Sequence, residues 1–102
     1  MAISQATVGT SATTIYTSSG SSATTAIFLM NNNAAARTVQ VYVVPSGGSA
    51  ATTTQIIKDL SIDGADTYIL NTEKLVLATG DTIQVTASAT TSIYATVSYV
   101  SI

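Results

Sequence analysis

Strand-length runs of β-branched and aromatic residues recur along this chain, and each run ends near a cluster of Gly, Asn, Asp or Ser. The clearest run is "RTVQVYVV" at 37–44, in which valine occupies every second position from Val39 to Val43. The closing run, "SIYATVSYVSI" at 92–102, alternates in the same manner. A period of two is typical of a strand that buries one face. We therefore expect the chain to fold from strands.

The connections between these runs are too short to hold crossover helices, so antiparallel pairing is expected. Segment 52–62 is ambiguous: its apolar residues have helical spacing, but the Thr run before them resists helix, which favours a strand or irregular edge over a short helix. The motif "ATGD" at 78–81 is expected to be the bend of a hairpin. The expected strands are 13–17, 24–31, 37–44, 52–62, 67–70, 74–77, 82–88 and 92–102.

These about eight strands predict an all-β fold, a single antiparallel β-sandwich of jelly-roll or immunoglobulin-like type over residues 13–102. Residues 1–12 lack a clean pattern, and we expect them to form an extended N-terminal arm that orders against a neighbour. The inward positions should pack between two sheets about 10 Å apart. The expected core residues are Ile15, Ile27, Leu29, Val39, Val41, Val43, Leu70, Leu75, Leu77, Ile83, Val85, Ile93 and Val97.

The chain contains neither Cys nor His. Disulfides and thiolate metal sites are therefore excluded, and the usual general base and the commonest metal ligand are missing. Neither the nucleophile motif G-x-S-x-G nor the phosphate-binding motif G-x-x-x-x-G-K occurs. No enzyme activity, cofactor or metal is expected.

Charged residues make up only 8% of the chain, against roughly 25% in typical soluble domains. The only cations are Arg37, Lys58 and Lys74, and the net charge is −2. So few dispersed cations argue against binding to nucleic acid or to anionic membranes. Ser and Thr form roughly a third of the residues. Because a surface of hydroxyls and alanine costs little to desolvate, a protein packed against neighbours is favoured over a hydroxyl-rich extracellular β domain.

The N-terminal residues "MAISQATVGTSATT" contain no basic segment and no apolar segment, so no secretory signal is expected. The longest apolar run, "AIFLM" at 26–30, has the length of a strand and falls far short of the ~20 residues of a membrane helix.

Three acidic residues lie close together in "DLSIDGAD", namely Asp59, Asp63 and Asp66. Calcium prefers six to eight oxygen ligands, and a loose loop site is one interpretation of this cluster. The EF-hand pattern is absent, however, and Asp-Gly is a strong turn signal. A polar turn is the favoured interpretation.

Glu73 and Asp81 are the candidates for a paired-carboxylate site of the kind found in glycosidases. The expected hairpin would place them at different ends. Asp81 is better explained as a turn residue that accepts hydrogen bonds from local backbone amides. Glu73 and Lys74 would lie at a strand entrance as edge-protecting charges.

Tyrosines and asparagines supply the candidate contact residues. A sugar-binding platform is one interpretation of the five tyrosines, but cross-strand packing explains them better because Tyr is common in strands. Asn31, Asn32 and Asn33 could bind a partner through their amides, although Asn runs also fill turns. Tyr42 and Tyr94 are expected on outer faces and are the best candidates for contacts between subunits. The candidate subunit-contact surface comprises Tyr42, Tyr94, Asn31, Asn32 and Asn33.

The order of these segments carries a family resemblance. The layout "TTIYTSSGSSATTAIFLMNNNAAARTVQVYVV", a Pro/Gly break and then "LVLATGDTIQVTASATTSIYATVSYVSI" resembles small β-sandwich virion proteins of tailed bacteriophages. In those proteins an "IYT" strand opens the domain, and an "L-x-x-G-D-x-I-x-V-x-A-S" hairpin precedes a closing Ile/Val strand. The resemblance covers about residues 10–102 and carries over no catalytic residue.

The resemblance implies a virion structural protein, assembled in the host cytoplasm. Capsid decoration, with the chain as a trimer seated between capsomers and bound to the major capsid protein, is the expected role. A tail, neck or fibre-base component is the alternative within virions, and a carbohydrate-binding module using Tyr42 or Tyr94 is the alternative from another class.

Overall fold

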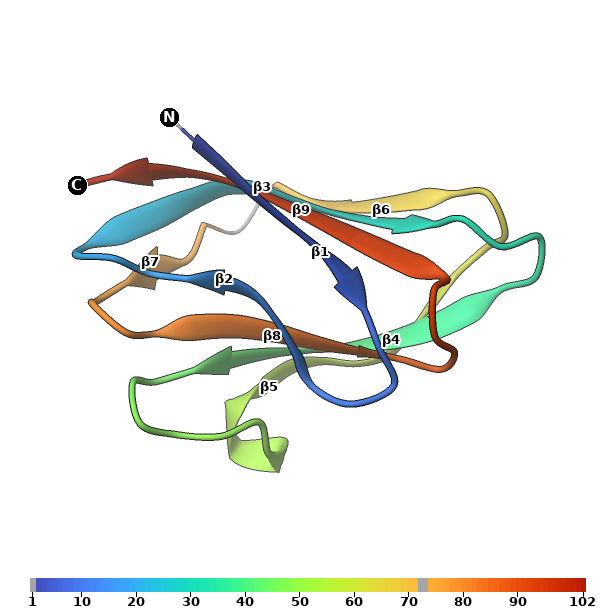
Figure 1. Ribbon diagram of the computed structural model, residues 1–102, viewed down its shortest axis with the longest axis horizontal. Helices are drawn as coiled ribbons and strands as arrows, with labels where there is room; N and C mark the ends of the chain where they lie inside the picture. The colour runs from blue at the N-terminus through green and yellow to red at the C-terminus, as the bar shows by residue number, and fades with distance from the viewer. Residues whose placement is uncertain (1, 72–73) are drawn as a thin grey trace.

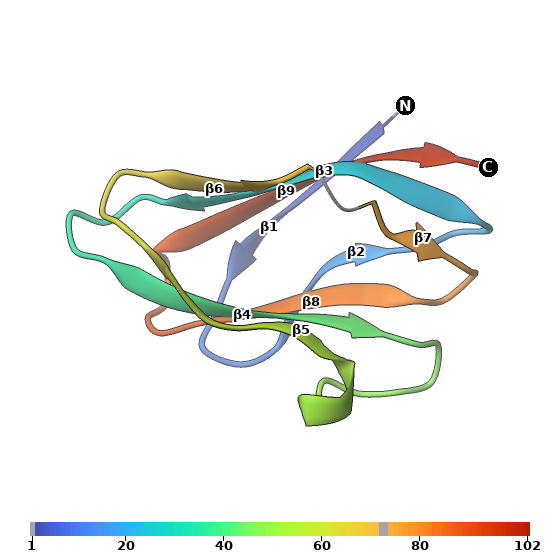
Figure 2. The same cartoon turned by 180° about the vertical axis from the view of Figure 1, so that it is seen from behind.

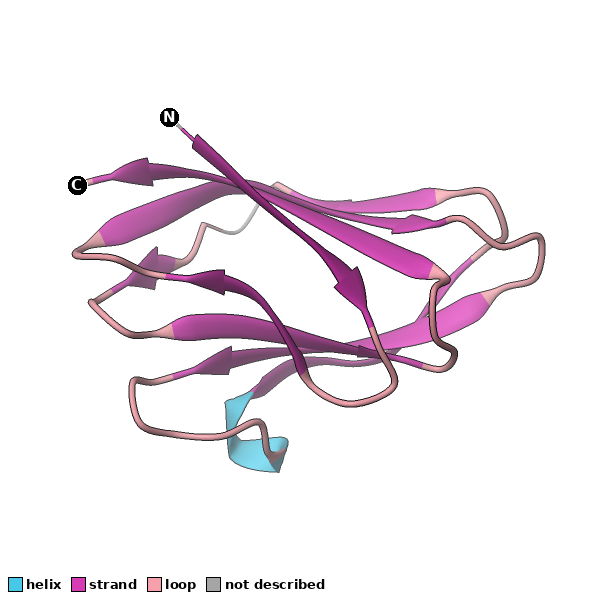
Figure 3. Ribbon diagram, in the orientation of Figure 1, coloured by secondary structure: helices cyan, strands magenta, loops and turns pink. Residues whose placement is uncertain are grey.

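Two antiparallel sheets packed face to face form the computed structural model, which describes residues 2–71 and 74–102 (Figure 1). Strands make up almost all of its regular structure, and the one helical element is a single 3-10 turn, η1 (Figure 3). The elements are β1 (Ala2–Val8), β2 (Thr13–Thr17), β3 (Ser22–Asn31), β4 (Arg37–Val44), η1 (Thr52–Thr54), β5 (Gln55–Ile62), β6 (Thr67–Leu70), β7 (Val76–Leu77), β8 (Thr82–Ala87) and β9 (Ile93–Ser101).

The five-stranded sheet has the order β1-β9-β3-β6, with β7 also paired to β3, and the four-stranded sheet has the order β2-β8-β4-β5. Setting β7 aside, the strands pair as β1 with β9, β2 with β8, β3 with β6 and β4 with β5. This is one long hairpin wrapped so that successive strand pairs alternate between the sheets. The predicted β-sandwich is thus confirmed, and its strand order is that of a jelly roll.

The N-terminal residues differ from the prediction of an arm over 1–12. Residues 2–8 form β1, which pairs antiparallel with β9 along its whole length. Val8 lies opposite Ile93, and both side chains are fully buried. The sequence pattern was misleading because β1 is an edge strand whose other inward positions are small or polar residues, Ser4 and Ala6.

The predicted hairpin around "ATGD" is wrong. β7 pairs with β3 in one sheet, whereas β8 pairs with β2 and β4 in the other, so residues 78–81 connect the two sheets. Gly80 has a φ of +87°, and a Cβ there would lie 2.5 Å from the Ser46 hydroxyl. The turn therefore needs glycine, as predicted. The turn connects the two sheets and does not join neighbouring strands of one sheet.

In segment 52–62 the favoured strand is confirmed for the apolar residues, and the one helical turn is made by the Thr run before them. Residues 52–54 form the 3-10 turn η1, and residues 55–62 form β5 at the open edge of the four-stranded sheet (Figure 2). One of the two register shifts between β4 and β5 spans Asp59, whose φ is +52°. Such irregularity and the neighbouring Lys58 are typical of an edge strand protected against pairing with another chain.

The core lies between the sheets and contains every predicted core residue. Val43, Leu70 and Leu75 are partly buried against it, and the other ten are buried. Tyr16, which was not predicted, is buried with its ring 4.3 Å from that of Tyr99 and donates a hydrogen bond of 2.8 Å to the Ser22 hydroxyl. Further buried residues that the sequence did not indicate are Val8, Val44, Ile62, Ala87 and Ala95.

Candidate functional site

The outer surface of the five-stranded sheet is rich in exposed apolar side chains. Alternation along β9 buries Ile93, Ala95 and Val97, so the residues between them point outward. The same alternation along β3 directs Phe28 and Met30 outward. We call this surface the apolar face, and its apolar members are Ile3, Ala23, Ala26, Phe28, Met30, Ile69, Val76, Tyr94 and Val100.

Strand register arranges these side chains in rows across the sheet. One row runs through Gln5, Thr96, Phe28 and Ile69, so Phe28 is flanked on both sides. The neighbouring row runs through Thr7, Tyr94, Met30 and Thr67. Phe28 and Met30 therefore lie on a central strand, side by side in consecutive rows. Large side chains of this face are 36–70% exposed: Ile3, Phe28, Met30, Ile69 and Val76.

Polar side chains on the apolar face bond to one another. Gln5 Nε2 donates to Thr96 Oγ1 at 3.3 Å, and Thr25 Oγ1 donates to Ser98 Oγ at 2.7 Å. A polar group that already has a partner costs less to remove from water than an unpaired one. Removing water from the face therefore leaves these two hydrogen bonds in place.

Charge is absent from the strands that build the apolar face. None of β1, β3, β6, β7 and β9, within the bounds given above, contains Asp, Glu, Lys or Arg. The nearest described charges lie at its margin. Lys74 Nζ donates to the Thr25 carbonyl at 2.7 Å, in the gap between β6 and β7, and also to the Asn71 carbonyl. Asp66 directly precedes β6.

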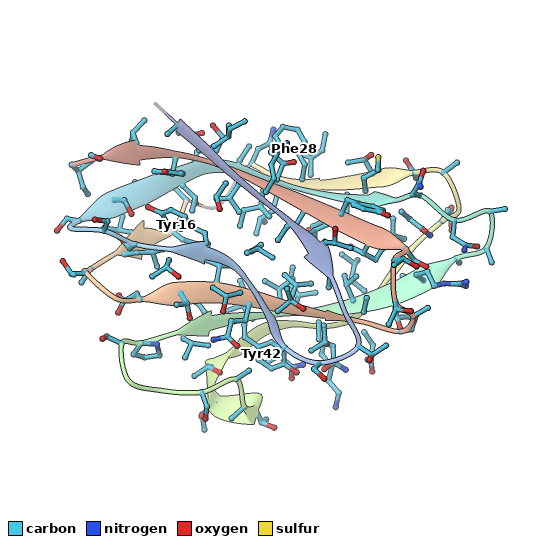
Figure 4. The ribbon with its side chains drawn as sticks, viewed as in Figure 1. Tyr16, Phe28 and Tyr42 are labelled. Carbon is cyan, nitrogen blue, oxygen red and sulfur yellow. The ribbon has the colours of Figure 1, made fainter. Side chains whose placement is uncertain are left out.

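The outer surface of the four-stranded sheet, which we call the polar face, carries hydroxyl and amide groups. Its residues are Thr14, Thr38, Gln40, Tyr42, Thr82, Gln84 and Thr86. Tyr42 donates its hydroxyl to Gln40 Oε1 at 2.7 Å, and Gln40 Nε2 donates to Asp59 Oδ1 at 2.8 Å. In Figure 4, Phe28 and Tyr42 lie on opposite outer sides of the sandwich and Tyr16 lies between the sheets.

The predicted contact residues do not form one surface. Tyr94 belongs to the apolar face beside Met30, whereas Tyr42 belongs to the polar face. Both rings are half-buried. The outward orientation that the sequence predicted for each tyrosine is confirmed, but no single partner surface can include both.

Asn31 must be removed from the candidate contact surface, because its side chain is fully buried. Its Nδ2 donates to the carbonyls of Ala35, Ile62 and Asp63 at 2.9, 3.0 and 3.3 Å. Its Oδ1 accepts from the Asn33 amide at 2.9 Å. Asn31 therefore joins the end of β3 to the end of β5 in the opposite sheet.

The two neighbours of Asn31 differ from it. Asn33 is half-buried and accepts a hydrogen bond from the Ala35 amide at 3.0 Å, which closes the turn before β4. Asn32 is exposed. Of the three asparagines, only Asn32 keeps the exposure that the contact hypothesis requires.

Two of the three acidic residues in "DLSIDGAD" accept side-chain or backbone hydrogen bonds in the part of the chain that the structure describes. Asp59 accepts from Gln40 and Asp66 Oδ1 accepts from the Thr67 amide at 2.8 Å. Within residues 2–71 and 74–102, no group of three or more acidic side chains is placed to hold a metal ion. The loose site considered for Asp59, Asp63 and Asp66 thus has no geometric support there.

Asp81 has the turn-holding role that the sequence predicted. Its Oδ2 accepts from the Ala78 amide at 2.9 Å and its Oδ1 accepts from the Ser46 amide at 3.0 Å. One carboxylate therefore ties the crossover turn to the turn after β4. Glu73, the other carboxylate of the candidate pair, lies outside the described residues.

No pocket was found over the described ranges. No helix among the described residues has the length and hydropathy needed to cross a membrane.

The sequence interpretation missed the apolar face, although one signal was present. The run "AIFLM" at 26–30 is continuously apolar rather than alternating. Uninterrupted apolar strands are typical of sheets buried on both faces. Ile27 and Leu29 account for the buried side of β3, so Phe28 and Met30 were the residues left to explain.

Comparison with known proteins gave no match: no protein-family model, no curated protein and no solved structure is significantly similar to the chain.

Proposed function

We propose that this chain is a structural protein of a virion, and specifically a decoration protein that binds between capsomers of a tailed-bacteriophage head. It would reinforce the shell mechanically, by burying complementary surface against the major capsid protein and against further copies of itself. The resemblance of its segments to small phage β-sandwich proteins and the jelly-roll strand order, which recurs in viral coat proteins, both support this proposal. Fold alone does not establish function.

The observation that carries the proposal is the placement of charge. The seven described charged residues all lie in turns, at strand ends or on the β5 edge: Arg37, Lys58, Asp59, Asp63, Asp66, Lys74 and Asp81. The inner strands of both sheets, apart from the first residue of β4, therefore present uncharged outer surfaces. The desolvation free energy of packing such a subunit against neighbours on several sides is small, because no charged group on these surfaces loses its hydration.

A tail, neck or fibre-base location is the alternative within the same class, and copy number separates the two. Decoration requires copies on the order of the number of capsomers, whereas neck and tail rings need only a handful. Quantitative mass spectrometry of purified virions from the phage that encodes the chain measures this directly. A high copy number supports decoration, a handful supports the alternative, and absence from the particle contradicts a virion role.

Addition to undecorated heads tests the binding itself. Purified chain should bind to heads that lack it, saturate at a fixed stoichiometry and raise the temperature at which the heads release DNA. Fully decorated heads are the matched control and should bind no more. No binding to undecorated heads would contradict decoration.

The carbohydrate-binding alternative has less support. It requires aromatic platforms, but Tyr42 and Tyr94 are on opposite faces, and the Tyr42 hydroxyl already donates to Gln40. Specific binding on a glycan array, lost in Tyr42→Ala or Tyr94→Ala, would overturn the preference for a structural role.

A further inference from the structure

The apolar face has no covering layer within the described chain, although exposed patches of this kind usually mark contact surfaces. Phe28, Met30 and Tyr94 lie together on its two inner strands, and aromatic residues and Met are enriched in protein interfaces. The opposite, polar face carries one aromatic residue, Tyr42, already bonded to its neighbour. The exposed large apolar side chains therefore gather on the apolar face, where there are five of them, whereas the other sheet exposes only Ile56 on its edge strand β5 among the described residues.

Charge restricts what can cover this face. The strands that build it contain no Asp, Glu, Lys or Arg. A charged partner surface would lose hydration and gain no opposite charge in return. The occupant must be uncharged and apolar, with few unpaired polar groups. The surface of described residues that satisfies this requirement is the apolar face itself.

Two copies of the apolar face can meet without like charges opposing one another. Isologous contacts of this kind, in which one patch meets the same patch of a second copy, generate twofold dimers, the commonest oligomers of soluble proteins. A closed trimer would instead need two different surfaces that fit each other. The two faces described here differ in polarity, which disfavours a trimer built from one apolar and one polar face.

The size of the face suits such a contact. Figure 1 looks along the shortest axis, and the two sheets lie one above the other, so each sheet is framed by the 38 and 20 Å extents. The rectangle that they frame has a projected area of about 760 Å² (38 × 20), which leaves room for a standard stable interface that buries ~800 Å² of accessible surface per partner.

We infer that two copies of this chain form a dimer by packing the outer faces of their five-stranded sheets against each other, with Phe28 and Met30 near the centre. The polar groups of the face include the Thr25–Ser98 and Gln5–Thr96 pairs, which keep their hydrogen bonds on association. The margin carries Lys74 and Asp66, which stay hydrated. The dimer goes beyond the proposed function, since it requires no virion.

Sedimentation equilibrium on the full chain, over a wide range of concentration, tests the dimer. Wild type should approach twice its 10.4 kDa mass as concentration rises. Phe28→Glu places a charge at the centre of the contact and should weaken association by at least about 100-fold. Tyr42→Glu is the matched control, an aromatic residue on an inner strand of the other sheet, and should leave the dimer intact.

A second variant guards against misfolding of the first. Ile69→Lys changes an exposed residue of the short edge strand β6 and should also weaken the dimer, with an unchanged circular dichroism spectrum. A protein that stays monomeric at every concentration, a trimer, or a dimer that survives both Phe28→Glu and Ile69→Lys would overturn the inference. Failure to bind phage heads, with a dimer present, would contradict only the proposed function.

Discussion

The two outer faces of the sandwich share one strand geometry and differ in what that geometry displays. On the five-stranded sheet, outward positions of β3 carry Phe28 and Met30, and no strand contains a charge. On the four-stranded sheet, outward positions carry Gln40, Tyr42 and Gln84, bonded laterally to one another or to Asp59 and Thr82. One sheet thus has a core side and a second side suited to burial, whereas the other has a core side and a water-facing side.

Substitutions of Leu29 and Met30 compare the contributions to stability of the buried and the exposed side of the same strand, β3. Leu29 is 1% exposed in the core and Met30 is 40% exposed on the apolar face. Leu29→Ala should lower the free energy of unfolding by about 2–5 kcal/mol through lost transfer energy and a cavity. Met30→Ala, of similar volume change, should cost about 1 kcal/mol in the monomer.

Urea denaturation at low and high protein concentration checks this pair. The loss in Leu29→Ala should be independent of concentration, whereas the loss in Met30→Ala should grow with concentration because the dimer contributes by mass action. Equal, concentration-independent losses for the two variants would mean that the outer face contributes nothing beyond the monomer.

The side-chain hydrogen bonds of Asn31 connect the two sheets at one end of the sandwich. Asn31→Leu leaves the carbonyls of Ala35 and Ile62 and the amide of Asn33 without their partner, and should cost about 2–3 kcal/mol. Asn32→Leu, at the exposed neighbour, is the matched control and should change stability by less than about 0.5 kcal/mol. Thermal unfolding measures both. If the two variants were equally stable, the buried hydrogen bonds of Asn31 would make no net contribution to the free energy of unfolding.

Substitution of Asp81 tests the crossover turn at residues 78–81, which belongs to neither outer face. Asp81→Ala removes the acceptor of the Ala78 and Ser46 amides and should lower stability by about 1–2 kcal/mol. Asp63→Ala is the control, since Asp63 is exposed and the structure describes no hydrogen bond to its carboxylate. Both variants should dimerise as wild type does in sedimentation. Dissociation of the Asp81 variant would show that the contact depends on this turn instead of the apolar face.

The smallest expected effect is that of salt. Exposed charges are largely screened as ionic strength rises, but the apolar face has no charge on its strands to be screened. The free energy of dimerisation should therefore change by less than about 0.5 kcal/mol between low and high NaCl. Isothermal dilution calorimetry provides the measurement. A steep decline of affinity with salt would indicate that Lys74 or Asp66 at the margin dominates the contact.

Much of the fold was predictable because alternation is a strong signal. Residues 13–17, 37–44 and 67–70 were predicted with their observed bounds, and the predicted core was found between the sheets. β1 escaped prediction because an edge strand with Ser4 and Ala6 inward has almost no hydrophobic contrast. The crossover at 78–81 escaped it because a Gly-Asp turn has the same local chemistry whether it joins partners in one sheet or links two sheets.

The candidate site was harder to predict than the fold. Tyr42 and Tyr94 could be assigned to outward positions from local alternation, but that rule does not say which sheet each strand joins. Asn31 looked like a turn residue, because burial of its amide depends on β5, more than thirty residues away. Phe28 and Met30 belong to a continuously apolar run. Without knowledge of the neighbouring strands, all residues of such a run are assigned to the core.

Intermolecular contacts across the apolar face are the central claim, and nuclear Overhauser effects measure them directly. In a mixed sample of isotopically labelled and unlabelled chain, filtered spectra should show contacts between subunits from the Met30 and Ile69 methyl groups to the Phe28 and Tyr94 rings. Contacts between subunits that involve Tyr42 or Thr86 instead, or none in a sample that sediments as a dimer, would contradict the account.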